Sequence, residues 1–204
     1  MIKCIIFDFD GTLADTYEEI KKIVNDLQYP KIKNINFEEV RDKGIRKMVK
    51  EAEIPLWKLP RFSYDVLKKL KEKKSTKIFP GTKIILNELV QDYKIGIVSS
   101  SSKENIEQTL KKKKIFGLFE FIYSDSSLFG KDKVLKRMLK NNNLNPNEIL
   151  YVGDEDRDIL AAKKVGIKII AVTWGFNSKE RLLFNNPDYI VDSPREITRI
   201  LNKK

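Results

Sequence analysis

The fold is decided by IKCIIF-DFDGT, residues 2–12, where an apolar run ends in two aspartates. The run predicts a buried strand that delivers Asp8 and Asp10 to its carboxyl end. Carboxylates are rarely buried unless they are paired or hold a metal, so this placement indicates a cation or phosphoryl chemistry. Gly11 lets the backbone approach closely, and the amides of Gly11 and Thr12 are expected to face the bound group. From these residues alone, an ordinary strand followed by an acidic turn is the alternative.

The composition limits the chemistry that the chain can perform. It has no histidine and a single cysteine, Cys4, which lies inside the first apolar run. Imidazole chemistry, the usual zinc ligands and an intrachain disulfide are therefore excluded. An enzyme of this composition works with carboxylates, lysine, hydroxyls and a hard metal. We expect a reduced, cytoplasmic protein with no membrane anchor and no signal peptide.

The net charge is strongly positive, because 40 lysines and arginines exceed 29 aspartates and glutamates by 11. Such an excess permits a nucleic acid, a membrane surface or a small anionic substrate as partner. The lysine clusters at 68–74 and 111–114 lie at predicted helix ends without interleaved aromatic residues. We therefore expect a lysine-rich surface that favours solubility, and no dedicated nucleic-acid site.

Short apolar runs alternate with helical patterns along most of the chain. The predicted strands are 2–7, 93–98, 119–123, 149–152, 167–172 and 189–191. This alternation predicts an α/β fold, a Rossmann-like parallel sheet with helices on both faces and ligands at the carboxyl ends of the strands.

The strand signal disappears between the first strand and residue 79. Three helices are expected there, the first capped by Asp15, the second beginning near Asn36 and the third running from about residue 59 to 74. The sequence thus predicts an α/β core domain of residues 1–14 and 80–204, with a helical domain of residues 15–79 inserted after the first strand.

Two further segments carry groups suited to a phosphate. Four serines, 99–102, follow a predicted strand, and their hydroxyls and amides form an anion site at the start of a helix. Ser99 ends the strand and is the better phosphate ligand, whereas Ser101 fits a helix-capping box. Farther along, helical periodicity places Lys131 in an apolar stripe and Lys133 almost opposite. A buried ammonium requires an anion, so Lys131 is predicted to face the site.

The predicted strand 149–152 leads into GDEDRD, residues 153–158. Asp154 stands where the strand stops, and Asp158 falls on the apolar face of the following helix. Glu155 and Asp156 are expected to be solvated acids that suit the helix dipole. Two inward acids beside the two at the first strand end require a cation, and oxygen ligands with open positions favour Mg²⁺ completed by a substrate phosphate.

These four motifs resemble, in order and spacing, those of the haloacid dehalogenase-like hydrolase superfamily. The helical insertion resembles the cap of its phosphoglycolate phosphatase-like branch, and Phe79-Pro80-Gly81 resembles the return of that branch into the core. The resemblance covers essentially the whole chain. It implies a Mg²⁺-dependent phosphatase that acts on a small anionic phosphate monoester. The residue after Lys131 departs from the third motif of the superfamily: many relatives have proline there, and this chain has Asp132.

The resemblance also implies a role for each site residue. Asp8 would be the nucleophile that forms an aspartyl-phosphate, and Asp10 would be the general acid and base. Asp8, the backbone carbonyl of Asp10 and Asp154 would hold Mg²⁺, with Asp158 behind them. The groups that would bind the transferring phosphoryl are Gly11, Thr12, Ser99, the amide of Ser100 and Lys131.

Several functional alternatives remain open. The carboxylate of Asp10 argues for phosphate esters and against dehalogenation, because a leaving oxygen needs a proton and a halide does not. A sugar phosphomutase of the same superfamily, a nucleic-acid-associated phosphatase or binding protein, and a catalytically silent regulatory member are the other candidates. In the cap, Arg46 beside Gly44 is a candidate second anion contact that sets specificity. The aromatic segment 174–176 either walls the cleft or packs in the core, and we expect a monomer or a homodimer.

Overall fold

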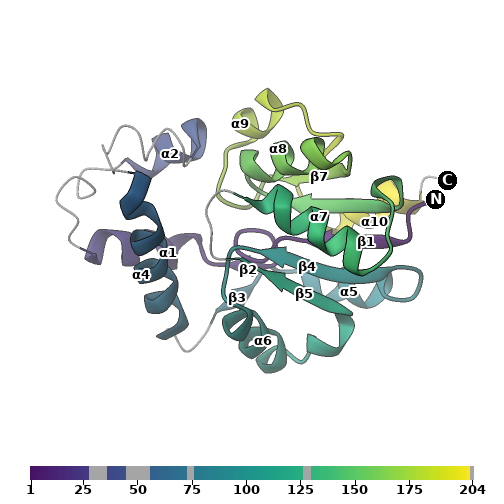
Figure 1. Cartoon of the computed structure of the whole chain (residues 1–204), viewed down its shortest axis with the longest axis horizontal. Helices are drawn as coiled ribbons and strands as arrows, with labels where there is room; N and C mark the ends of the chain where they lie inside the picture. Colours follow the sequence, from purple (N-terminus) through teal and green to yellow (C-terminus); the bar gives the residue numbers. More distant parts are fainter. Residues whose placement is uncertain (28–35, 45–55, 73–75, 126–129, 203–204) are drawn as a thin grey trace.

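A computed structural model describes residues 1–27, 36–44, 56–72, 76–125 and 130–202 (Figure 1). Six strands form one sheet in the order β5-β4-β1-β6-β7-β8, and every neighbouring pair is parallel. Their bounds are β1 Cys4–Phe7, β4 Lys94–Ser99, β5 Phe121–Ser124, β6 Ile149–Gly153, β7 Lys168–Val172 and β8 Tyr189–Val191. The predicted Rossmann-like parallel sheet is confirmed, and each strand falls on or within a residue of a predicted apolar run.

Helices cover both faces of the sheet. Their bounds are α5 Thr82–Leu89, α6 Lys103–Lys112, α7 Lys131–Asn141, α8 Asp156–Val165, α9 Lys179–Phe184 and α10 Pro194–Asn202, with short 3₁₀ turns at Phe116–Leu118 and Pro146–Glu148. Ile5 and Phe7 of β1 join an apolar cluster with α5, α6 and α10, whereas Cys4 and Ile6 join a second cluster with α7, α8 and α9. Burial on both faces explains why the strands are apolar throughout, with no alternation of polar residues.

The first strand lies in the middle of the sheet, between β4 and β6. Phe7 is in register with Ile97 on one side and with Val152 on the other. The amide of Asp8 still donates to the carbonyl of Val152, at 2.8 Å, so Asp8 leaves the sheet between the carboxyl ends of two neighbours. Parallel α/β sheets bind ligands at such points, where the strand order changes direction.

Three helices of the inserted segment lie together beside the sheet, at the left of Figure 1. They are α1 Tyr17–Asp26, α2 Phe37–Lys43 and α4 Leu59–Glu72, the last preceded by a 3₁₀ turn at Leu56–Lys58. Side chains of α1 and α4 form an apolar cluster of their own, made of Ile23, Val24, Phe62, Val66 and Leu70. This separate core supports our proposal that residues 15–79 form a cap domain on a core of residues 1–14 and 80–204.

Two of the three helices begin as predicted. The side chain of Asn36 caps α2 by accepting a hydrogen bond from the amide of Glu38, and α4 begins at Leu59. The expected last residues of the third helix, 73 and 74, lie outside the described residues. Among the described residues, no helix combines the length and apolarity needed to cross a membrane.

The start of the first helix differs from the prediction. Ala14–Asp15 form a short strand, β2, which pairs antiparallel with β3, Lys77–Ile78. Because Asp15 belongs to this strand, the N-cap of α1 is Thr16, whose side chain makes no capping hydrogen bond. The prediction that Asp15 caps this helix is wrong, because pairing with a segment about 60 residues away overrides a local preference.

Candidate active site

Three buried aspartates meet at the carboxyl edge of the sheet. Asp8 follows β1, Asp154 follows β6, and Asp158 lies in the first turn of α8. One carboxylate oxygen from each lies within 4.8 Å of those of the other two, and all three residues are at most 2% exposed. The structure therefore brings together acids that are far apart in the sequence, as the strand-end motifs predict.

Lys131 lies between two of these carboxylates. Its ammonium is 2.7 Å from Oδ2 of Asp8 and 2.5 Å from Oδ1 of Asp158. Burial alone would lower the pKa of Lys131, but the carboxylates of Asp158 and Asp8 raise it above its ordinary value. Lys131 is therefore a buried cation, and Lys133 is exposed, so the predicted orientation of the two lysines is confirmed.

Asp154 is held by two donors from different parts of the chain. The hydroxyl of Thr12 donates to one carboxylate oxygen and the amide of Phe176 to the other, each at 2.7 Å. Burial raises the pKa of Asp154 well above its ordinary value, and the nearby carboxylates of Glu155, Asp158 and Asp8 raise it further. The cluster therefore fits a hard cation, because oxygen donors that repel one another become favourable only when a positive charge lies among them.

Two glycines make room for the carboxylate of Asp154. A Cβ atom at Gly11 would lie 2.1 Å from its Oδ2, and a Cβ atom at Gly175 would lie 2.2 Å from the same oxygen. Gly11 also has a φ of +77°, which side chains rarely adopt. Its amide donates to the carbonyl of Ala14, at 2.8 Å, so the expectation that this amide faces the bound group is wrong. The amide of Gly11 is used within the tight turn, and what Gly11 contributes to the site is room for the carboxylate of Asp154.

Asp10 lies beside the cluster but is not part of it. The hydroxyl of Ser101 donates to Oδ2 of Asp10. The other oxygen, Oδ1, is buried and has no hydrogen-bond partner among the described residues. Burial raises the pKa of Asp10 to about 6, and the hydrogen bond from Ser101 opposes this rise. One oxygen of Asp10 is thus oriented by the protein, and the other is left for a further partner.

The serine segment after β4 differs by one residue from the prediction. Ser102, and not Ser101, is the N-cap of α6, with its hydroxyl accepting from the amide of Asn105 at 3.3 Å. Ser101 is instead bonded to Asp10, which is possible because the chain turns before the helix begins. Ser99 is buried at the strand end, as expected, and its hydroxyl accepts from the amide of Ser101 at 3.1 Å.

The prediction that Glu155 and Asp156 are solvated is wrong, because both are buried against arginines. Arg157 forms an ion pair with Glu155 at 2.5 Å, and Arg181 forms one with Asp156 at 2.5 Å. Arg157 also donates to the hydroxyl of Ser100, at 3.4 Å, so it connects the last motif to the serine segment. Its place inside GDEDRD is the signal in the sequence that could have indicated this role.

The aromatic segment after β7 closes one side of the site. The indole of Trp174 donates to the carbonyl of Thr12 at 3.1 Å. The ring of Phe176 meets that of Tyr17, in α1, edge to face with centroids 5.5 Å apart. The guanidinium of Arg41, in α2, lies over the Tyr17 ring at 5.2 Å. Residues from the helical segment therefore reach the wall of the site. The cap residue that was predicted to set specificity, Arg46, lies outside the described residues.

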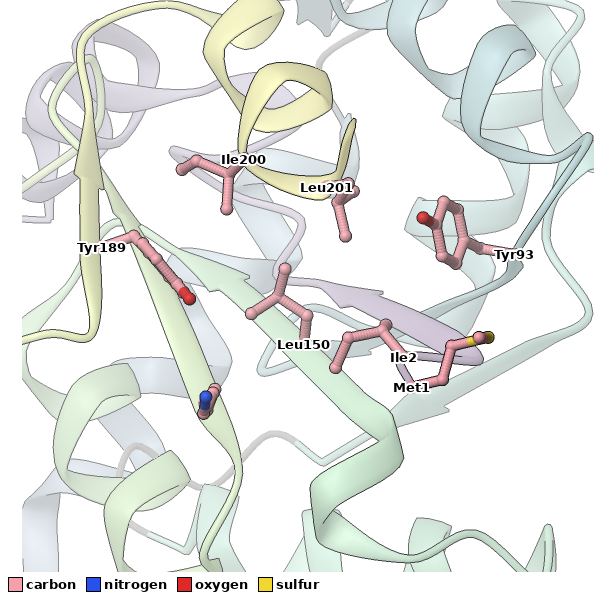
Figure 2. Close-up of a pocket in the computed structure, with 8 residues that line it drawn as sticks. Met1, Ile2, Tyr93, Leu150, Tyr189, Ile200 and Leu201 are labelled. Carbon is pink, nitrogen blue, oxygen red and sulfur yellow. The ribbon is translucent and has the colours of Figure 1, made fainter. Parts of the chain in front are cut away.

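A cavity of about 230 Å³ lies at the opposite edge of the sheet. Ile2, Tyr93, Leu150 and Lys168, which line it, stand at or just before the starts of four strands, and Leu201 of α10 also lines it (Figure 2). Asp8 and Asp154 follow the other ends of two of these strands, so the cavity is separate from the candidate active site.

Comparison with known proteins agrees with this geometry. A family described as haloacid dehalogenase-like hydrolase matches residues 5–172. A phosphoglycolate phosphatase from Synechococcus elongatus is 31% identical over 99% of this chain and 98% of its own length. A putative pyrophosphatase PpaX from Clostridium perfringens is 30% identical over 100% of this chain and 99% of its own. The crystal structure of a predicted phosphatase from Clostridium acetobutylicum, 23% identical, has the same fold, with a TM-score of 0.82 over 98% of this chain and 99% of that chain.

Proposed function

Because the chain belongs to the haloacid dehalogenase-like hydrolase family, we propose that it is a Mg²⁺-dependent phosphatase of small phosphate monoesters, similar to phosphoglycolate phosphatase. The observation that carries this proposal is the buried group of Asp8, Asp154 and Asp158 with Lys131 between two of its members. A cytoplasmic location and a monomeric or homodimeric state stay predictions from the sequence.

We assign the nucleophile to Asp8 and the proton transfers to Asp10. Oδ1 of Asp8 accepts from the amide of Phe9 at 2.7 Å, and Oδ2 accepts from Lys131, so the carboxylate is held in one orientation. A carboxylate oxygen attacks phosphorus, the bond to the alcohol oxygen breaks, and Asp10 protonates that oxygen. Asp10 then takes a proton from a water that attacks the aspartyl-phosphate, which releases phosphate and restores Asp8.

The remaining groups neutralise charge during the transfer. Phosphoryl transfer is catalysed chiefly by positioning and by electrostatic stabilisation. Ser99, the amide of Ser100 and Lys131 are assigned to the phosphoryl oxygens, because the two serines stand at the end of β4, the neighbour of β1, and Lys131 contacts Asp8. When bound, Mg²⁺ would supply further positive charge for those oxygens from a site made by Asp8, the backbone carbonyl of Asp10 and Asp154. Thr12 is assigned to holding Asp154, because its hydroxyl is already bonded there.

Removal of the metal is the direct test of this proposal. Excess chelator should reduce hydrolysis of a generic aryl phosphate by at least about 100-fold, because the repelling carboxylates then lack their counter-charge, and added Mg²⁺ should restore the rate. Steady-state rates before and after chelation and after readdition measure the effect. Full activity in excess chelator would show that the metal assignment is wrong.

The positive surface gives a second, separate expectation. The exposed lysines 111 and 112 end α6, away from the strand ends that build the site. We expect a short duplex or single strand to bind weakly, with an affinity that collapses as salt approaches physiological strength, because only screened phosphate contacts are available. Binding titrations at several salt concentrations measure this. A catalytic efficiency for phosphorylated oligonucleotide ends above that for every small ester would favour the nucleic-acid alternative.

A further inference from the structure

Helix α2 brings Arg41 to the wall of the site. Its Nη2 lies 3.5 Å from the carbonyl of Gly175, and its guanidinium lies over the ring of Tyr17. Gly175 in turn packs directly against Asp154, and the next amide along the chain, that of Phe176, donates to Asp154. Arg41 therefore contacts the segment of the site wall that packs against Asp154.

The position of Arg41 is fixed by two contacts of α2 with the core. The carbonyl of Arg41 accepts from the amide of Ser178, at 3.1 Å. At the end of α2, Gly44 is packed so closely on the ion pair of Asp156 and Arg181 that a Cβ atom there would lie 2.7 Å from Oδ2 of Asp156. The helix is thus seated on α8 and α9, and it holds the guanidinium beside residues 175 and 176.

The guanidinium of Arg41 lacks the partners that a half-buried charge requires. Its Nε is buried and has no hydrogen-bond partner in the part of the chain that the structure describes. Within the same described ranges, Arg41 forms no ion pair with a carboxylate, although Arg157 and Arg181 nearby each have one. A buried charged donor without an acceptor is destabilising, and a planar guanidinium is suited to a carboxylate or a phosphate.

We propose that Arg41 binds a second anionic group of the substrate, one that belongs to the leaving group of the phosphoryl transfer. The preferred substrates are then phosphate esters or anhydrides that carry another negative charge. A carboxylate and a second phosphate share this chemistry. Lys131 lies between Asp8 and Asp158 and is assigned to the transferring phosphoryl, so the two cations would each bind a different anionic group of the substrate. The ring of Tyr17 covers one face of the guanidinium, and this partial burial would strengthen the contact with an anion. The inference rests on the proposed phosphatase function.

The test compares matched substrates with and without the second charge, using the full chain with Mg²⁺. The pairs are 2-phosphoglycolate with 2-hydroxyethyl phosphate, and pyrophosphate with methyl phosphate. Arg41→Gln should raise KM for the charged member of the preferred pair by about 10- to 100-fold, because a charge-assisted hydrogen bond is lost. The catalytic efficiency with the member of the pair that lacks the second charged group should change by less than about threefold. Arg41→Lys should retain part of the affinity for the second anionic group, because it keeps the positive charge and loses the paired N–H donors of the guanidinium.

Arg61→Gln is the matched control, because Arg61 is a highly exposed arginine of α4, paired with Asp65 at 3.1 Å. It should leave both members of each pair unchanged, and thermal unfolding of every variant should stay close to that of the wild type. The pair that responds identifies the second group as carboxylate or phosphate.

Equal losses with substrates that carry a second charged group and with those that lack it, or no change with either, would overturn the assignment of Arg41 while the phosphatase function stands. A wild-type protein that hydrolyses none of the four compounds would overturn the proposed function, and this inference with it.

Discussion

Asp8→Asn should abolish turnover and leave the protein folded. The amide has nearly the shape of the carboxylate but cannot attack phosphorus, so we expect a loss of at least about 1,000-fold in kcat. The oxygen of the asparagine can still accept from the amide of Phe9, and Lys131 keeps Asp158 as a partner. Steady-state rates with an aryl phosphate, together with a thermal unfolding curve, separate loss of chemistry from loss of structure.

Binding of fluoroberyllate gives a second measurement of the same assignment. This group mimics a phosphoryl attached to a carboxylate, so it should bind the wild type and not Asp8→Asn. Asp132→Asn is the control, because Asp132 lies in the first turn of α7 with Lys164 as its partner, outside the acidic cluster. A variant at position 8 that retained even a tenth of the wild-type rate would rule out the covalent mechanism.

Lys131→Ala should cost several kcal/mol of transition-state stabilisation, whereas Lys133→Ala should cost little. Removal of the first ammonium withdraws the charge that faces the phosphoryl group, and it leaves Asp8 and Asp158 without the cation between them. The second lysine is exposed on the far side of the same helix. Values of kcat/KM for both variants, measured with one substrate, give the comparison. Equal losses would mean that the position on the helix does not determine the role.

The sheet could be predicted from the sequence because its central strands are buried on both faces. Apolar runs such as Cys4–Phe7 and Lys168–Val172 need no partner to be recognised, and the acids and serines at their ends locate the site. The pair β2 and β3 could not be predicted, since each strand has two residues and exists only through pairing with the other. This pairing is also why Asp15 does not cap the first helix.

The errors within the site share a physical cause. Ser101 and Ser102 are identical in type, so only the direction of the chain after β4 decides which of them caps the helix. Asp156 is buried because Arg181 reaches it from another helix, a contact that no local pattern indicates. Arg41 stands in no recognisable motif, and its position beside Gly175 depends on how α2 seats on the core.

The close packing of two glycines on Asp154 has a consequence for how such sites lose activity. The volume that one methyl group would fill at Gly11 or Gly175 is already occupied by the carboxylate. A substitution there would displace the carboxylate without altering any acid, lysine or serine of the four motifs. Inspection of the reacting residues alone would then count an inactive protein as intact. An intact active site in this fold therefore depends partly on residues that have no side chain.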